Sequence, residues 1–573
     1  MTAIIPATAW RHQRAVKVET KGDPERRGRV RVALAMLGFV ALYGVLAFRL
    51  VLLGVSAHGM EEDGAILTRA ASQARPDIVD RNGETLATDI RTAALFAEPR
   101  YVIDPDEATE LLASVLPDLD RDRLRQLLST EAKFAYIKRE ITPRQQQAIH
   151  KLGIPGIGFR VENRRFYPGG PAASHVLGTV NVDNRGIAGI EKYIDGAFLN
   201  DLHEAGFATG SALEPVKLSL DLRVQHVVRD EMLQAMTRYN AIAAIGIVLD
   251  VNSGEVLGMS SVPDYDSNNR DEALDKDKMN RATVGVFEMG STFKGFTTAM
   301  ALDSGMVRIT DSFDATHGLT VGKFTISDFH GKHRWLTVPE IFIYSSNVGS
   351  AREALAVGMQ GQHDYLKRFG LLDTQETELP EAGAPIVPKM PWAKVTTITM
   401  AFGHGISVSP MQMAAASAAL VNGGYLITPT FLPRTAEQAT QVARPILRPE
   451  TSLAMRRLFR LNVLKGSGRR ADVPGYSVGG KTGTAEKVEG GRYSGNKRRN
   501  AFVAAFPMDA PKYLVLVVLD EPKSERPGIG ATAGLNTAVV AGNIIRRSAP
   551  MLGVEPKAVD PEDGSAMALA FAQ

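Results

Sequence analysis

The chain has 573 residues, of which 44% are hydrophobic and 23% charged, and its formal net charge is +3. This length exceeds that of one ordinary domain and the composition is globular, so two or three folded units are expected. The sequence has no cysteine, which excludes disulfide scaffolds, thiol catalysis and cysteine-ligated metal sites.

The N-terminal part combines a basic tail with an apolar segment. Residues 11–31 hold eight basic and three acidic residues, so they contribute +5 and the rest of the chain is nearly neutral. Nucleic acid is therefore not expected as a partner. The segment 32–55 contains only one charge, Arg49, and is long enough to span a bilayer. We expect a cytoplasmic tail over 1–31 and one transmembrane helix over 32–55, with the remainder outside the membrane. A cleaved signal peptide is the alternative.

Residues 56–210 carry none of the catalytic motifs described below. Asp80-Arg81-Asn82-Gly83 lies between apolar residues and predicts a hairpin, with Asn82 and Gly83 adopting the positive φ angles of a tight turn. A basic and aromatic cluster, Arg164 to Pro168, is interpreted as a packed surface.

A second folded unit is expected over residues 211–552, followed by a loose tail over 553–573. Its first part predicts a helix over 222–239 and two strands over 241–249 and 256–260. Its last part predicts a strand over 513–519 and a helix over 534–548. Strands from both ends with helices between them indicate an α+β architecture, an antiparallel sheet with flanking helices.

Three short motifs in this unit carry candidate chemistry. They are Ser291-Thr292-Phe293-Lys294, Ser345-Ser346-Asn347 and Lys481-Thr482-Gly483-Thr484. Residues three apart share a helix face, so Lys294 would lie beside the Ser291 hydroxyl and could take its proton as a neutral amine. Burial and a helix N-terminus both favour the neutral amine.

The third motif predicts a strand at the edge of a cleft. Gly483 would let a substrate backbone approach, and Lys481, Thr482 and Thr484 would bind a substrate carboxylate. The backbone N–H groups of Ser291 and Thr484 are the candidate oxyanion donors. Ser345 and Asn347 would relay protons and hold the peptide amide.

Two other parts of the chain satisfy these patterns by chance. Ser494 and Lys497 repeat the S-x-x-K spacing, and Ser267 with Asn269 repeats S-x-N. We expect them in solvated loops, because only the ordered set of three motifs places a nucleophile, a relay and a strand together.

Together with Asp80 to Ala87 and Gly186 to Glu191, the three motifs resemble the class B penicillin-binding proteins. The stretches Glu288 to Lys294, Tyr344 to Gly349 and Phe402 to Gly405 are most similar to those of the division-specific (FtsI-type) transpeptidases. The resemblance implies the penicillin-recognising serine transpeptidase fold, preceded by a β-rich pedestal or dimerisation domain and one membrane helix.

The resemblance also implies the reaction and the partners. Ser291 would be acylated by the D-Ala–D-Ala end of a stem peptide, and an amine of a neighbouring stem would then form the cross-link. It implies septal synthesis at the bacterial inner membrane with a periplasmic catalytic domain, and inhibition by β-lactams. A SEDS-type glycosyltransferase and other divisome membrane proteins would be partners, and no cofactor or metal would be needed.

Three alternatives stay open at this point. An elongation-specific class B transpeptidase would use the same chemistry in another complex. A serine β-lactamase would need a group that activates water, for which no acidic motif is evident. A β-lactam sensor would need further membrane spans or a cytoplasmic effector domain.

Overall fold

The computed structural model describes residues 36–49, 75–199, 213–489, 492–526 and 528–558. The chain divides into two compact units, Met1–Arg69 and Ala70–Gln573, which are described separately. In the first unit residues 36–49 are helical, and the other residues of the expected segment 32–55 lie outside the described ranges, as do residues 559–573 of the expected tail. Within the described ranges, no helix combines the length and the apolar character that crossing a membrane requires.

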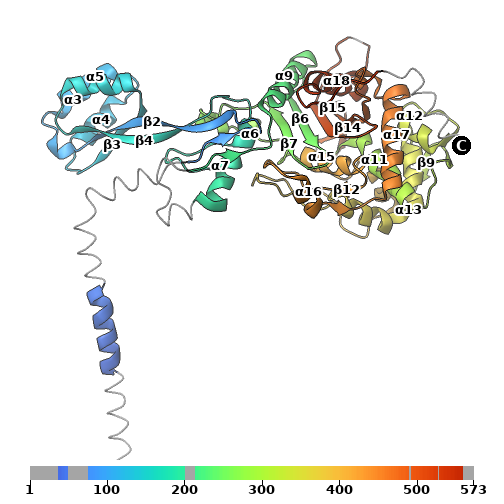
Figure 1. Cartoon of the computed structure of the whole chain (residues 1–573), viewed down its shortest axis with the longest axis horizontal. Coiled ribbons are helices and arrows are strands. Elements are labelled where there is room, and N and C mark those ends of the chain that lie inside the picture. Colours follow the sequence, from blue (N-terminus) through green and yellow to red (C-terminus); the bar gives the residue numbers. More distant parts are fainter. Residues whose placement is uncertain (1–35, 50–74, 200–212, 490–491, 527, 559–573) are drawn as a thin grey trace, which may run out of the picture. The chain divides into compact units, whose positions relative to one another are not determined.

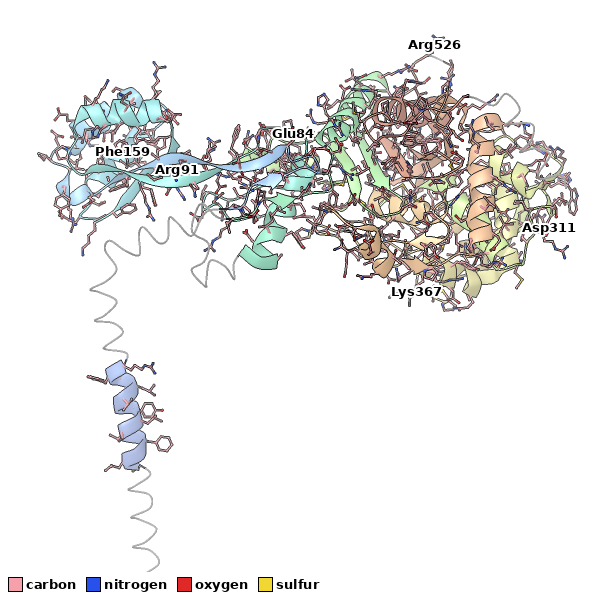
Figure 2. The ribbon with its side chains drawn as sticks, viewed as in Figure 1. Glu84, Arg91, Phe159, Asp311, Lys367 and Arg526 are labelled. Atoms are coloured by element: carbon pink, nitrogen blue, oxygen red, sulfur yellow. The ribbon has the colours of Figure 1, made fainter. Side chains whose placement is uncertain are left out.

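The second unit begins with a sheet built around the long strand β2 (Thr85–Ala97). This strand runs antiparallel to β1 (Ile78–Val79), β3 (Ala135–Ile141) and β4 (Ile157–Phe166), while β1 pairs in parallel with β5 (Val216–Lys217). Helices bury one apolar core against β2, and the partly buried Phe159 packs at this core (Figure 2). These helices are α3 (Pro105–Val115), α4 (Arg121–Leu128) and α5 (Pro143–Leu152).

The hairpin between β1 and β2 is confirmed, with a different turn chemistry from the one expected. Only Gly83 has a positive φ, +92°, whereas Asn82 does not. The Asp80 carboxylate instead accepts hydrogen bonds from the backbone N–H groups of Asn82 (2.7 Å) and Glu84 (2.9 Å). An aspartate that bonds the backbone two residues ahead fixes a turn without a second left-handed residue.

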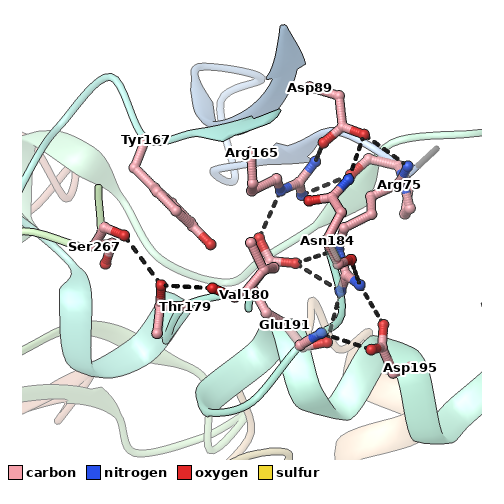
Figure 3. Close-up of polar contacts among 12 residues, drawn as sticks. Arg75, Asp89, Arg165, Tyr167, Thr179, Val180, Asn184, Glu191, Asp195 and Ser267 are labelled. Atoms are coloured by element: carbon pink, nitrogen blue, oxygen red, sulfur yellow. Dashed lines mark hydrogen bonds and ion pairs between the residues drawn. The ribbon is translucent and has the colours of Figure 1, made fainter. Parts of the chain in front are cut away.

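A buried ion-pair network joins the segments of this region (Figure 3). Arg165 and Arg75 donate to the two oxygens of Glu191 at 2.6 and 2.8 Å, and the Arg165 and Glu191 side chains are fully buried. Asp89 accepts from Arg165 at 3.1 Å, and Asp195 pairs with Arg75. Burial raises the pKa of Glu191, but the charges of Arg165 and Arg75 outweigh it and hold that pKa below its ordinary value. Arg165 therefore belongs to an interior network, so the interpretation of its cluster as a packed surface is wrong for this residue.

The network lies where the first sheet meets the helical turns that precede the part of the chain with the three motifs. Those turns are α6 (Ser174–Leu177), α7 (Gly189–Ile194) and η2 (Asp195–Leu199). Nearby, the Thr179 hydroxyl donates to the carbonyl oxygen of Ser267 at 3.1 Å (Figure 3).

The part that carries the three motifs is organised around a five-stranded antiparallel sheet in the order β14-β15-β16-β6-β7. Along β6, Ile245, Ile247 and Leu249 face one buried core, and Ala244 and Val248 face another. Both faces of this strand are therefore covered, which explains its continuous apolar run in the sequence. The strands are β6 (Ala243–Asp250), β7 (Val256–Val262), β14 (Gly479–Glu489), β15 (Arg492–Phe506) and β16 (Tyr513–Asp520).

Helices cover the two faces of this sheet and confirm the expected α+β architecture (Figure 1). On one face pack α9 (Leu222–Arg238) and α18 (Thr537–Ser548), whose bounds agree closely with the helices expected from the sequence. The other core contains α11 (Lys294–Asp303), α13 (Asn347–Arg368) and α15 (Pro410–Ala419). Further helices are α10 (Arg270–Ala273), α12 (Val338–Tyr344), α14 (Lys394–Met400), α16 (Ala436–Val442) and α17 (Pro449–Lys465). Short strands are β8 (Ser312–Asp314), β9 (Leu319–Val321), β10 (Phe324–Ile326), β11 (Trp335–Thr337), β12 (Tyr425–Leu426) and β13 (Arg444–Pro445).

Candidate active site

Ser291 lies in a short turn, η4 (Gly290–Phe293), that leads directly into α11. Its neighbours Thr292 and Phe293 are buried, whereas Ser291 is only partly buried. Gly290 has a φ of +53°, and a Cβ atom there would lie 2.8 Å from the carbonyl oxygen of Thr484. The turn that presents Ser291 therefore needs glycine both for its backbone conformation and for its contact with β14.

Two further glycines fix this turn from other segments. A Cβ atom on Gly483 would lie 2.4 Å from the carbonyl oxygen of Met289, and one on Gly403 would lie 2.3 Å from that of Gly290. The sequence suggested that Gly483 makes room for a substrate backbone. In the structure its missing side chain makes room for the protein's own nucleophile turn, because β14 packs directly against η4.

Lys294, Ser345, Asn347 and Lys481 meet at one point, although they come from three separate motifs. The Nζ atoms of Lys294 and Lys481 lie 3.1 and 3.0 Å from the Ser345 hydroxyl oxygen. Lys294 also donates to the Asn347 side-chain oxygen at 2.7 Å and to the Ser345 carbonyl oxygen at 2.5 Å. Ser345 thus bridges two amines, one of which lies a single helical turn from the nucleophile.

Burial changes the acid–base chemistry of both amines. Burial lowers the pKa of Lys294 to about 7, although the charges of Asp328 and Glu353 act to raise it. Burial, and then the charge of Lys294, lowers the pKa of Lys481 well below its ordinary value. Both side chains are 0% exposed, and two buried ammonium groups around one hydroxyl would repel each other, so at least one is held as a neutral amine.

The local backbone conformation positions the Ser345 side chain next to the two lysines. It ends α12 in the left-handed conformation, with a φ of +56°, which is uncommon for a residue other than glycine. Ser346 then caps α13 by accepting from the backbone N–H of Gly349 at 2.9 Å. Asp328 accepts from the Ser346 hydroxyl at 2.7 Å and from the backbone N–H of Val348 at 3.0 Å, which holds the loop in place.

Thr482 and Thr484 lie on the edge strand β14, as the motif predicts. The Thr482 hydroxyl contacts the Ser467 hydroxyl at 2.6 Å. The Thr484 hydroxyl accepts from the backbone N–H of Ala533 at 3.3 Å, so its own proton remains free to donate. Side chains alternate along a strand, so Thr482 and Thr484 share the face of β14 opposite to that of Gly483.

Sequence reasoning missed several residues around this centre. Asp328 orders the serine–asparagine loop, and Glu353 is a fully buried carboxyl on α13 that accepts from the Thr298 hydroxyl at 3.0 Å. Burial raises the pKa of Glu353 to about 8. No short motif marks either residue. Gly403, in the Phe402 to Gly405 stretch, has a φ of +79° and contacts the backbone of Gly290, a role that no pattern of neighbouring residues indicates.

The chance matches to the motifs lie outside the cluster around Ser345. Ser494 and Lys497 are on strand β15, and Ser267 is 1% exposed. The solvated-loop interpretation is therefore wrong for Ser494 and Lys497, whereas Ser267 lies in a turn, as expected, but is buried.

Polar and aromatic side chains also surround Glu288, which lies shortly before the turn that contains Ser291. Glu288 accepts from the backbone N–H of Gly405 at 2.8 Å and from the Tyr493 hydroxyl at 3.2 Å. The His404 ring lies between those of Phe402 and Tyr493, with centroids 5.4 and 5.2 Å away. Burial, and then the charge of Lys294, lowers the pKa of His404 to about 4, so this ring is neutral at pH 7.

Known proteins match the chain over nearly its whole length. Residues 71–196 match the penicillin-binding protein dimerisation domain, and residues 244–546 match the penicillin binding protein transpeptidase domain. The probable peptidoglycan D,D-transpeptidase FtsI of Caulobacter vibrioides is 37% identical over 562 residues, covering 96% of this chain and 93% of the relative. The stage V sporulation protein D of Bacillus subtilis is 31% identical, over 91% of this chain and 86% of the relative.

A solved structure shares the fold. Penicillin binding protein 3 from Mycobacterium tuberculosis, complexed with aztreonam, superposes with a TM-score of 0.64 at 24% identity, over 84% of this chain and 97% of that one. The two matched domains, in this order and over this length, identify the family: the chain belongs to the class B penicillin-binding proteins, which join a dimerisation domain to a transpeptidase domain.

Proposed function

We propose that this chain is a serine D,D-transpeptidase that cross-links peptidoglycan stem peptides in the septal wall during division. The observation that carries the proposal is the Ser345 hydroxyl held between the amines of Lys294 and Lys481, at 3.1 and 3.0 Å, beside the Ser291 turn. A nucleophile, a base with a pKa near neutrality and a hydroxyl that can relay protons are the parts that acyl transfer through serine requires.

In the first half-reaction Ser291 attacks the carbonyl carbon between the two terminal D-alanines. Its proton passes to the neutral amine of Lys294, and the backbone N–H groups of Ser291 and Thr484 stabilise the oxyanion. The carbon–nitrogen bond then breaks. The leaving D-alanine amine takes a proton through Ser345, and the donor peptide remains as an ester on Ser291.

In the second half-reaction the amine of a neighbouring stem attacks this ester. A carbon–nitrogen bond forms, the bond to the Ser291 oxygen breaks, and a proton from the amine returns to that oxygen through Lys294. A β-lactam enters the same first step, but its opened ring stays attached to the acyl group and does not leave the site.

The direct test is labelling of the purified chain with fluorescent penicillin, followed by mass mapping of the modified peptide. We expect a stable adduct on Ser291 and none on Ser291→Ala, which removes only one hydroxyl from a partly buried position. An adduct on Ser291→Ala would overturn the assignment. Rapid hydrolysis of the wild-type adduct would favour a β-lactamase instead.

An elongation-specific transpeptidase is the second candidate, because the chemistry of the site would be the same. The 37% identity to the FtsI-type relative favours division. Imaging a fluorescent fusion in growing cells separates the two, since a division enzyme gathers at midcell and an elongation enzyme along the lateral wall.

The proposal includes a single inner-membrane anchor, with residues 1–31 in the cytoplasm and the catalytic part in the periplasm. Support comes from the basic tail before an apolar segment, and from the helix over 36–49, whose large apolar side chains are exposed. Protease protection in spheroplasts tests this, because only the C-terminal part should be cleaved from outside. A SEDS-type glycosyltransferase and other divisome proteins are proposed partners, to be tested by co-purification from membranes.

A further inference from the structure

A cavity of about 420 Å³ lies between α17, the segment before β14 and the turn after β15. The mechanism above uses none of its lining residues. Its charged side chains are four cations and two carboxylates, which gives the cavity a net charge of +2. A concave surface with an excess of one charge attracts a group of the opposite charge. The six charged side chains are Arg456, Arg457, Arg460, Lys557, Asp472 and Asp509.

The three arginines on α17 are only partly neutralised. Arg460 is 6% exposed and donates to Asp472 at 2.7 Å and to the Val478 carbonyl oxygen at 2.9 Å. Arg456 lies one helical turn earlier on the same face, where two like charges destabilise a helix. Burial lowers its pKa, and its Nε atom donates to a backbone carbonyl oxygen at 2.5 Å. Within the described ranges, Arg456 has no carboxylate partner and the Arg457 side chain has no hydrogen bond or ion pair.

The chain itself passes this cavity where the described ranges end. Lys557 and Ala558 line the cavity. The residues just before them pack against the protein, because Val554 is 5% exposed and the backbone N–H of Lys557 donates to the Gly475 carbonyl oxygen at 2.8 Å. Two residues of chain span at most about 7 Å, so Asp560 cannot be far from the cavity that Ala558 lines.

The residues that follow carry the complementary charge. Residues 559–573 include Asp560, Glu562 and Asp563 and no lysine or arginine, so their side chains have a net charge of −3. Carboxylates form charge-assisted hydrogen bonds with guanidinium groups, often in pairs. A segment joined to its binding site by a short linker has an effective concentration of about 1 mM or more, so a modest affinity is enough to hold it there.

We propose that residues 559–563 bind in this cavity, with their carboxylates on Arg456 and Arg457, and so fasten the C-terminal segment to α17. In an extended segment alternate side chains share one side, which lets Asp560 and Glu562 face the arginines together. This occupant neutralises the two guanidinium groups that lack a carboxylate among the described residues.

The helix α17 also holds the strand that carries Lys481. Asn462 on this helix donates to the Gly480 carbonyl oxygen at 2.7 Å, and Arg460 donates to that of Val478. A C-terminal segment docked on α17 therefore supports the start of β14 without contacting the reacting groups.

The test uses the absence of cysteine from the chain. Ser565→Cys introduces a single thiol for a nitroxide label on the full-length protein, and electron paramagnetic resonance measures the fraction of slowly rotating label. With an effective concentration of about 1 mM and a dissociation constant of about 0.1 mM, roughly nine-tenths of the label should be in the slow fraction. Asp560→Asn, Glu562→Gln and Asp563→Asn together should reduce this fraction to about one-tenth or less. Salt at about 1 M, where the Debye length is about 3 Å, should also reduce it.

Arg457→Gln removes one partner from the cavity side. Loss of one charge-assisted hydrogen bond weakens binding about tenfold, so the slow fraction should fall to about one-half. The matched control is Arg469→Gln, which removes the same charge from an exposed arginine that does not line the cavity and should leave the fraction unchanged. Acylation of Ser291 by fluorescent penicillin should stay within about twofold in every variant, which verifies that each is folded.

Three results would overturn the proposal. A label that rotates equally fast with and without the three acidic residues would mean that the segment does not dock. A slow fraction that survives both Arg457→Gln and the loss of the three acidic residues would place the segment elsewhere. A slow fraction that grows with protein concentration would assign the cavity to the segment of a second copy. Failure of the unsubstituted protein to react with penicillin would overturn the proposed transpeptidase function and not the docking, which the label reports independently.

Discussion

The lowered pKa of Lys294 makes the strongest prediction for the chemistry of this protein. An ordinary lysine amine has a pKa of 10.5, and burial brings that of Lys294 to about 7. At pH 7 about half of the Lys294 amines are then neutral, compared with roughly one in three thousand for an ordinary lysine. This difference of about 5 kcal/mol in proton affinity is what allows the amine to act as a base.

The sign of the pH dependence follows from the need for the neutral form. Below pH 7 Lys294 gains a proton, so acylation by fluorescent penicillin should slow about tenfold for each further pH unit. Above pH 8 the rate should reach a plateau. Rapid-mixing measurements between pH 5.5 and 9 would check this. A profile that is flat from pH 5.5 to 7, or still rising at pH 9, would refute Lys294 as the base.

Lys294→Arg is the matched variant for this prediction, because it keeps a positive charge that cannot be removed at these pH values. We expect the acylation rate to fall by about 10²–10⁴-fold at every pH, and its dependence on pH around pH 7 to disappear. Circular dichroism would verify that the variant is folded. If it kept the wild-type pH profile, another group would have to act as the base.

Three other predictions concern stability and the nucleophile turn. Arg165→Met removes the buried partner of one Glu191 oxygen and of Asp89, leaves Arg75 on the other oxygen, and should cost about 3–5 kcal/mol at pH 7. Because the folded pKa of Glu191 is lowered, its contribution to folding stability is present above about pH 4.5 and is lost as the pH falls through the folded pKa. Thermal unfolding in which the variant lost as much stability at pH 4 as at pH 7 would contradict this. Glu353 has the opposite sign, with a folded pKa of about 8 against an ordinary 4.5, so its favourable contribution is lost as the pH rises towards 8. Denaturant unfolding should therefore show Glu353→Gln gaining stability relative to the wild type from pH 5 to pH 8, by about 3–4 kcal/mol. A stability difference that stayed the same across this pH range would contradict the prediction. Gly290→Ala should slow acylation at least about tenfold and cost about 2–4 kcal/mol of folding stability, because the new Cβ meets a carbonyl oxygen at 2.8 Å. Gly305→Ala is the control, because Gly305 also has a positive φ but a Cβ there would have nothing within 4 Å. This variant should cost only about 1–2 kcal/mol and keep the acylation rate.

The sequence by itself determined the elements whose patterns are local. The apolar runs of β6 and β16, the helices α9 and α18, and the turn at Gly83 all follow from residues that are neighbours in the chain. The three-residue spacing of Ser291 and Lys294 is local in the same sense, because consecutive helical turns bring the two side chains to one face. These features could be predicted since no distant contact is needed to form them.

Only the tertiary structure decided which residues complete the site and why the glycines are needed. Lys481 reaches Ser345 across 136 positions of sequence, and Gly290, Gly403 and Gly483 are required because three separate backbones touch at one turn. The pKa of Lys294 and the burial of Glu353 likewise depend on how much water the packed helices exclude. Close backbone contacts and desolvation are properties of segments brought together by folding, and no pattern of neighbouring residues records them.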